Sequence, residues 1–173
     1  PALMGAANPV GGVTSAIGNN KTLELLLKSG ADPNLQAHEN GLSALYLAAS
    51  KSVEAVKLLL KYGAEPNIEN IHKATPIFEA ASEDNVEIVD ALVEAGADIN
   101  HEMETPDGEK MYPLDAAIGG NGEGEGSSQD VAKYLFAKGA KYNPDMSDVE
   151  LMVHANEEQA SHHDELGAEG RYH

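Results

Sequence analysis

The chain of 173 residues contains no cysteine, no tryptophan and two phenylalanines, and aromatic residues make up 5% of it. The lack of cysteine excludes disulfide bonds and thiolate chemistry, and it is compatible with the cytoplasmic or other intracellular location that we expect. Hydrophobic residues make up 42% of the chain, which is enough for a core. Because large rings are scarce, that core must be built from Leu, Val, Ile and Ala, which suits thin helical layers better than a thick sandwich.

Basic residues are also scarce, since 11 Lys and Arg stand against 29 Asp and Glu and give a formal net charge of −18. The excess is larger in residues 101–173, where sixteen acidic residues stand against five basic ones. An acidic field of this size disfavours nucleic acids and anionic membranes and would steer a basic partner towards the protein. An acidic surface also simply keeps a repeat protein soluble, so charge alone does not define a binding site.

Long apolar runs are absent. The longest aliphatic runs, such as Leu25–Leu27 and Leu58–Leu60, are far too short to span a membrane. Residues 1–9 lack the basic and apolar segments of a signal peptide. We therefore expect no membrane association. Because the chain does not begin with methionine, we expect it to be a piece of a longer protein.

A short phrase, Gly-Ala-Asp-Pro-Asn or a variant of it, occurs four times, and its glycines are 33, 33 and 43 residues apart. Apolar residues recur three, four and seven positions before each glycine, which predicts a helix with one apolar stripe. Glycine directly after such a stripe supplies the left-handed residue that ends a helix. A fixed period in this range indicates a solenoid. The four copies are Gly30–Asn34, Gly63–Asn67, Gly96–Asn100 and Gly139–Asn143.

The residues around these phrases extend the pattern. Thr75–Ala81 reads Thr-Pro-Ile-Phe-Glu-Ala-Ala and opens the unit that Gly96–Asn100 closes, and Ser43–Ala49 and Tyr112–Ile118 are related openings. The pattern resembles the ankyrin repeat, whose Thr-Pro-Leu-His-x-Ala-Ala opening and Gly-Ala-Asp-Val-Asn close recur every 33 residues. The chain departs from that family at the usual histidine, which makes an inter-repeat hydrogen bond there. The residues that replace it are Tyr46, Phe78 and Asp115.

The predicted fold class is all-α, an α-solenoid of about four ankyrin-type helix-turn-helix repeats with β-hairpin-like finger loops. Residues 1–155 would form one repeat domain, in which Ser147–Glu150 has the spacing of a capping box and opens a capping helix. The polar residues after it show no periodicity, so we expect an acidic disordered tail. The predicted units are residues 10–34, 35–67, 68–100 and 101–143, followed by the capping helix at 147–155 and the tail at 156–173.

The first unit has two possible registers. Val13–Gly18 matches Leu114–Gly119 and is the preferred first helix. In the competing register the first helix is Pro1–Ala7, which resembles Ser43–Ala49, and a long insertion follows it. The first register is preferred because the paired glycines at 11 and 12 are unfavourable inside a helix.

The fourth unit holds ten extra residues. Four of them lie around Thr105–Gly108, where Pro, Asp and Gly occupy the positions that a tight turn favours. We predict a lengthened hairpin with Met103 and Met111 on its two arms. The other six fall within residues 119–128, where five glycines predict a mobile loop between the two helices of the unit.

No catalytic signature is present. A Ser-His-Asp order, a phosphate-binding glycine loop and a metalloprotease motif do not occur on suitable elements, so we expect neither an enzyme nor a cofactor. His38 and His72 fall in neighbouring fingers, which lie on the order of 10 Å apart in a helical stack and are too distant to share a metal ion. His162–Glu165 falls in the predicted tail. We therefore expect no metal site.

The predicted function is recognition of a protein partner with a basic surface by a monomer, through its fingers and concave groove. Tyr46 and Phe78 among polar and acidic residues resemble an aromatic anchor inside a charged rim, or alternatively both rings fill the place of the family histidine. Residues of the projecting fingers are better contact candidates because they have no core role. The predicted contact residues are Gln36, His38, Glu39, Asn40, Tyr46, Glu69, Asn70, His72, Lys73, Phe78, Glu79, Glu102, Glu104, Asp107 and Glu109.

Two further hypotheses concern Asn100 and the chain as a whole. Leu92 with Asp98–Asn100 matches the pattern at which asparagines of ankyrin repeats are hydroxylated by an oxygen-sensing dioxygenase in an animal-type host. Alternatively, these asparagines fix the hairpin base by side-chain hydrogen bonds. The alternative to partner recognition is an architectural segment that spaces the domains of a larger protein, which the missing methionine and the degraded first unit favour.

Overall fold

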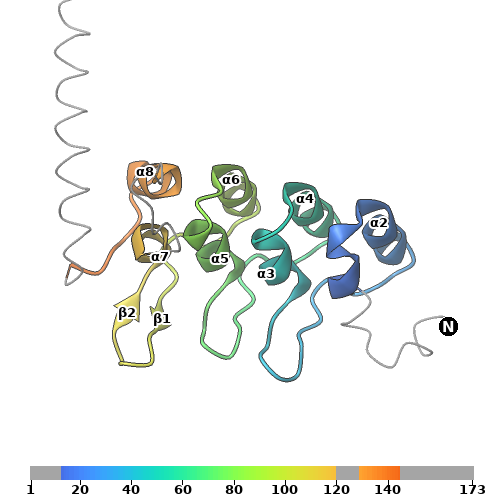
Figure 1. Ribbon diagram of the computed structural model, residues 1–173, viewed down its shortest axis with the longest axis horizontal. Helices are drawn as coiled ribbons and strands as arrows, with labels where there is room; N and C mark the ends of the chain where they lie inside the picture. The colour runs from blue at the N-terminus through green and yellow to red at the C-terminus, as the bar shows by residue number, and fades with distance from the viewer. Residues whose placement is uncertain (1–12, 120–128, 145–173) are drawn as a thin grey trace, which may run out of the picture.

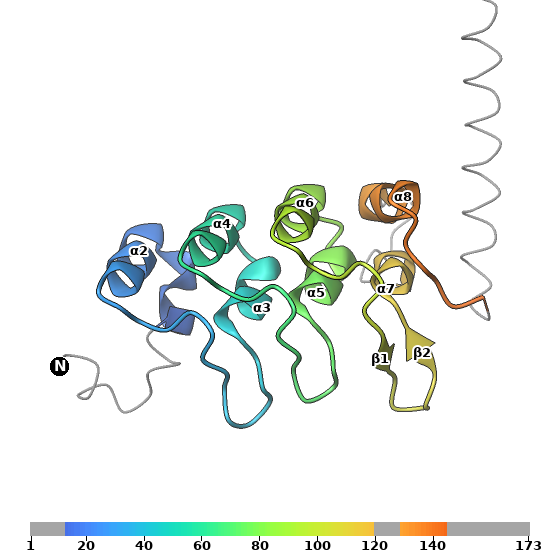
Figure 2. The same ribbon diagram turned by 180° about the vertical axis from the view of Figure 1, so that it is seen from behind.

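The computed structural model describes residues 13–119 and 129–144. Within these residues, pairs of helices stack side by side in one row, and loops project from one edge of the row (Figures 1 and 2). The all-α solenoid predicted from the repeats is confirmed. The competing first helix at Pro1–Ala7, all but the first residue of the predicted mobile loop at 119–128, the capping helix at 147–155 and the tail at 156–173 lie outside the described residues.

The helices form two layers (Figure 1). The layer away from the loops holds the second helix of each unit, namely α2 (Asn20–Lys28), α4 (Val53–Lys61), α6 (Val86–Glu94) and α8 (Asp130–Ala137). The layer beside the loops holds the first helices, namely η1 (Ala16–Gly18), α3 (Ala44–Ala49), α5 (Pro76–Ser82) and α7 (Pro113–Gly119). Residues 13–15 are helical and lead into η1, so helical turns occupy the segment of the preferred first register.

Polar caps and glycines set the ends of the second helices. The side chains of Asn19, Ser52 and Asn85 each accept a hydrogen bond from a backbone N–H three residues later and so start a helix. Each second helix is followed within two residues by a glycine with positive φ, a conformation that other residues adopt only with strain. These glycines are Gly30, Gly63, Gly96 and Gly139, with φ between 78° and 100°.

Aliphatic side chains fill the space between the two layers, as the composition requires. The first helices contribute alanines such as Ala48 and Ala81 beside large residues such as Ile77, and the second helices contribute residues such as Leu59 and Leu92. All five side chains are fully buried. The alanines let the two layers approach closely, so a continuous core forms mainly from aliphatic side chains.

Asparagines connect each unit to the next at the base of the fingers. The side-chain oxygen of Asn34 accepts a hydrogen bond from the Glu65 N–H at 2.7 Å, and its amide donates to the Gly63 carbonyl at 3.1 Å. Asn67 repeats this pair of bonds one unit later, and the Asn100 oxygen accepts from the Lys141 N–H at 2.7 Å. The side-chain hydrogen bonds expected of these asparagines are therefore present, while hydroxylation of Asn100 stays a prediction.

The loops before α3, α5 and α7 are the second finger (residues 35–42), the third finger (residues 68–74) and the fourth finger (residues 101–111). The fourth finger contains the antiparallel strands β1 (Met103–Glu104) and β2 (Lys110–Met111), with Met103 opposite Met111. Its turn closes when the Gly108 N–H donates to the Thr105 carbonyl at 2.9 Å. The predicted lengthened hairpin with a methionine on each arm is confirmed.

Candidate partner-binding face

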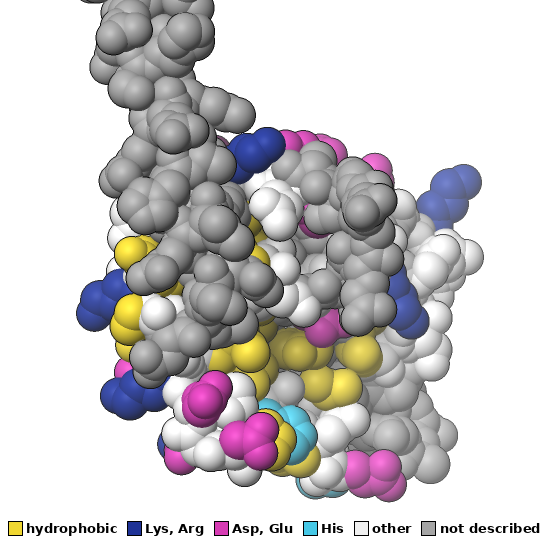
Figure 3. Space-filling view, turned by 60° about the vertical axis from the view of Figure 1, so that its left-hand side comes forward, with side chains coloured by type: hydrophobic (Ala, Val, Ile, Leu, Met, Phe, Trp, Pro, Cys, Tyr) yellow, Lys and Arg dark blue, Asp and Glu magenta, His cyan; other side chains and the backbone are white. Residues whose placement is uncertain are grey.

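A groove of about 350 Å³ lies where the fingers meet the first helices, at the junction of the third and fourth units; we call it the junction groove. Figure 3 shows hydrophobic side chains gathered beside the fingers, with acidic and histidine side chains next to them. The helices contribute Tyr46, Phe78, Glu79, Ser82 and Ala116 to its lining, and the fourth finger contributes Met103, Glu104, Pro106 and Met111. Asn70, His72 and Ala74 of the third finger complete it.

Tyr46 lies half-buried on α3 and faces α5. Burial of the ring, and then the neighbouring carboxylate of Glu79, raise the pKa of Tyr46 to about 12. The Tyr46 hydroxyl donates a hydrogen bond to Glu79, which favours its protonated form. Tyr46 packs against the core at the place of the family histidine and also lines the groove, so its role as a partner contact stays a prediction.

Phe78 is 4% exposed, so it belongs to the core and does not project as an anchor. Its ring forms an edge contact with the ring of His101, with the centroids 6.2 Å apart and an interplanar angle of 82°. Phe78 therefore forms the floor of the junction groove, and its predicted role as an exposed contact is corrected. The reason is that α5 packs against both α3 and α7, which covers most of the ring.

Three buried polar residues at the start of the first helices differ in the hydrogen bonds that their side-chain oxygens accept. The hydroxyl oxygen of Thr75 is buried and has no hydrogen-bond partner among the described residues, whereas the equivalent Ser43 accepts a bond from the Tyr46 N–H at 3.2 Å. Asp115, at the position of the family histidine, is fully buried and accepts bonds from the backbone N–H groups of Asn143 and Tyr112, each at 2.9 Å. Burial raises the pKa of Asp115, and these two bonds oppose that shift without cancelling it.

Three amide side chains predicted for partner contact have a structural role as well. Gln36 donates to the carbonyls of Gly41 and Glu69 at 2.8 and 2.7 Å, which joins the second finger to the third. The side-chain oxygen of Asn40 accepts from the Leu42 N–H, and that of Asn70 accepts from the N–H groups of His72 and Ala74. These bonds shape the fingers.

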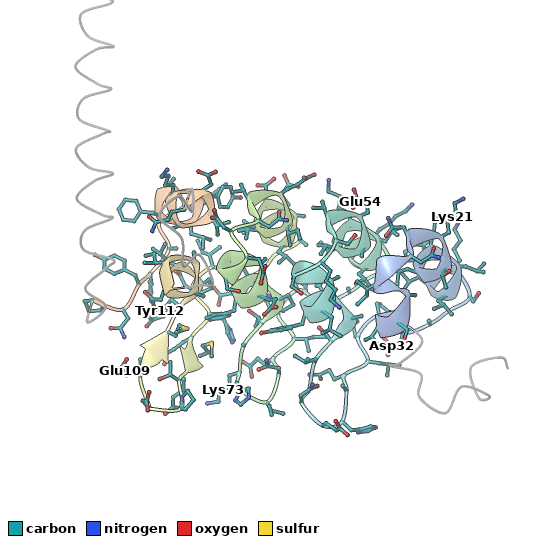
Figure 4. All side chains as sticks on the ribbon, in the orientation of Figure 1. Lys21, Asp32, Glu54, Lys73, Glu109 and Tyr112 are labelled. Carbon is teal, nitrogen blue, oxygen red and sulfur yellow. The ribbon has the colours of Figure 1, made fainter. Side chains whose placement is uncertain are left out.

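The other predicted finger residues are exposed and differ in their intramolecular partners. Glu102 pairs with Lys110 at 2.9 Å, and the hydrogen bond from Lys110 is the main cause that lowers the pKa of Glu102. Glu69 lies 3.2 Å from the ring of His101. Within residues 13–119 and 129–144, no salt bridge includes the remaining exposed residues, which are His38, Glu39, His72, Lys73, Glu104, Asp107 and Glu109. Lys73 and Glu109 are labelled in Figure 4.

His101 is a connecting residue whose role is not predicted from the sequence. Its Nε2 lies 2.9 Å from the Lys73 carbonyl oxygen and 3.2 Å from a Glu69 carboxylate oxygen, so it links the third and fourth fingers. The same ring covers Phe78. The available signal was its position directly after Gly96–Asn100, since a residue there starts the next finger and meets the preceding one.

The chain matches a known family over more than half of its length. Residues 4–103 correspond to ankyrin repeats in three copies. The chain belongs to the ankyrin-repeat family. Its match begins six residues before the first predicted unit and ends within the fourth finger, and the α7–α8 pair continues the ankyrin array beyond the matched range. No curated protein was found to match the chain.

Ankyrin repeats are generally protein–protein interaction modules, and the family is generally non-catalytic. In the part of this ankyrin chain that the structure describes, no cluster of three or more His, Asp or Glu side chains is arranged to hold a metal ion. None of the described helices is long and apolar enough to cross a membrane.

Proposed function

We propose that this ankyrin-repeat protein, acting as a monomer inside the cell, recognises a protein partner with a basic surface through its fingers and junction groove. The observation that carries the proposal is the composition of the groove, where an apolar floor is bordered by Glu79 and Glu104 and none of the described residues that line it is a lysine or arginine. An apolar centre with a polar rim is the usual anatomy of a protein interface. It agrees with a chain of net charge −18.

The finger tips extend the acidic rim beyond the groove. Glu39, Asp107 and Glu109 are exposed and take part in no salt bridge among the described residues, so their charge is available to a partner. Exposed charges of one sign raise the rate of encounter with an oppositely charged surface, and salt weakens the effect. A basic partner would therefore bind faster and more tightly at low ionic strength.

The test is affinity capture from a lysate of the source organism at low salt and at about 0.3 M salt. The binding variant is Glu39→Lys with Glu109→Lys, at two finger tips. Its matched control is Glu54→Lys with Glu94→Lys, which makes the same change of net charge on the second helices. Figure 4 shows Glu54 and Glu109 on opposite edges of the array. All three proteins are first shown to be equally folded.

We expect wild type and the control to enrich the same protein, the finger variant to bind it about tenfold more weakly, and high salt to release it. A titration with the purified partner gives the affinities. Capture that neither variant changes, or that yields no partner, would contradict the proposal. It would favour the alternative that the array is an architectural spacer between domains.

A further inference from the structure

The junction groove differs from a flat contact surface because it is a recess with a defined floor. Phe78 and Ala74 are buried beneath it, and Ala116 of α7 forms one side. Pro106, near the turn of the fourth finger, forms part of its lining. The hydrogen bonds of the finger turn and the β1–β2 pairing fix the position of this side of the groove, which the fourth finger forms.

Two methionines supply the adaptable part of the recess. Met103 and Met111 face each other across the β1–β2 pair and are partly buried against the core. Methionine is unbranched and polarisable, so it fits side chains of different shape. A volume of about 350 Å³ is at the lower end for ligand pockets, which suits one large side chain with its adjoining backbone rather than a folded domain.

The acidic residues at the edge of the junction groove indicate which partner residue would lie beside the bound apolar side chain. Glu79 on α5 and Glu104 on β1 both line the groove, and neither takes part in a salt bridge within the described part of the chain. A carboxylate beside an apolar recess favours a partner that brings a Lys or Arg next to its apolar residue. The segment 145–173 of this chain is rich in Asp and Glu with a single Arg, so its charge is wrong for this site, as is the charge of a second copy.

We propose that the junction groove is a subsite for a partner segment that presents one large apolar side chain, such as Leu, Met or Phe, directly beside Lys or Arg. This inference rests on the proposed function and names the feature of the partner that the groove reads. The apolar side chain lies between the two methionines and Phe78. The neighbouring cation lies against Glu79 or Glu104.

The experiment uses the full chain and a set of synthetic peptides with a fluorescent label. The parent peptide is Gly-Ser-Lys-Leu-Lys-Ser-Gly with blocked ends. One variant replaces Leu by Gly, one replaces both Lys by Gln, and an acidic peptide reproduces residues 156–173. Fluorescence anisotropy gives the affinities, and methyl NMR signals of Met103 and Met111 report contact with the groove.

We expect the parent peptide to bind at least about tenfold more tightly than the Gly variant, which is the factor that burial of a leucine side chain supplies. It should also bind more tightly than the Gln variant and the acidic peptide, and it should shift both methionine signals. Ala116→Leu, which fills the groove, should weaken binding at least about tenfold, whereas Ala137→Leu on exposed α8 should not. Glu104→Gln, an exposed change without effect on packing, should reduce the preference for Lys over Gln.

Equal binding of the Leu and Gly peptides, binding of no basic peptide, preference for the acidic peptide, or binding unchanged in folded Ala116→Leu would each overturn the subsite. The proposed function has a separate test, because Glu39 and Glu109 do not line the groove. If the finger variant loses the captured partner while the peptide results are negative, the subsite alone is wrong. If no partner is captured by wild type, the proposed function itself is wrong.

Discussion

The asparagines at the finger bases make contacts that repeat from unit to unit, whereas the residues at the start of the first helices make contacts that differ between units. At the bases, Asn34 and Asn67 occupy equivalent positions and make the same two bonds to the next unit. At the openings, the equivalent positions hold Tyr46, Phe78 and Asp115, and each has different neighbours. The bases bond to backbone groups whose positions repeat with the fold, so asparagine makes this connection from each of the first three units. The openings meet neighbours that differ between units, namely side chains at Tyr46 and Phe78 and backbone N–H groups at Asp115, so each position makes different contacts.

The repeated asparagine bonds connect the units of the array, and the contacts at the start of the first helices make one unit different from the next. The asparagine–backbone bond is the same in several units, whereas a contact at the start of a first helix occurs in one unit and has no equivalent in the others. Substitutions at the two kinds of position should therefore differ in size and in sign. The largest effect is expected where a unique side chain is both buried and fully bonded.

Asp115→Ala is expected to destabilise the protein by about 2–4 kcal/mol. The substitution removes the acceptor for the N–H groups of Asn143 and Tyr112, and Asp115 is 0% exposed. The melting temperature should fall by roughly 5–10 °C for a chain of this size. Thermal and urea unfolding measure the change, with exposed Asp107→Ala as the control that should stay within about 0.5 kcal/mol. Equal melting temperatures for wild type and Asp115→Ala would show that these bonds do not support the fourth unit.

Asn67→Ala is expected to cost less, about 1–2 kcal/mol, because its two inter-unit bonds lie at the surface. Hydrogen exchange should identify the lost bond directly, since the Asp98 N–H would exchange faster in the variant. Asn20→Ala, an exposed asparagine on α2, is the matched control. Unchanged exchange at Asp98 would mean that the repeated asparagines do not couple neighbouring units. The contrast between the finger bases and the first-helix openings would then not hold.

The sequence predicts the repeated features well and the unique ones poorly, and the two regions explain why. The helix ends, the glycine positions and the hairpin at Thr105–Gly108 follow from local rules that act within a few residues. The burial of Phe78 and the contact with His101 depend on residues 23 positions apart in neighbouring units. The roles of Gln36 and Asn70 likewise depend on hydrogen bonds whose partners become known only from the fold.

The predicted contact residues also differ in whether their position follows from local sequence or from contacts between units. Projection of Glu39, Asp107 and Glu109 follows from their place in polar loops, so their exposure was predictable. The groove itself was not, because it requires Met103 and Met111 to face α5 across a junction between units. Periodicity locates the elements of a solenoid, and the stacking of different units decides where a recess forms between them.

The smallest expected effect has the opposite sign. Thr75→Val should stabilise the protein by about 1 kcal/mol, because the Thr75 hydroxyl is buried without a hydrogen-bond partner in the described residues and makes no cap bond to α5. Ser43→Ala at the equivalent position should instead destabilise by about 1 kcal/mol, because it removes the cap bond from the Tyr46 N–H. Unfolding curves of both variants measure the two signs. If both substitutions destabilised the protein, the buried hydroxyl of Thr75 would not reduce stability as proposed.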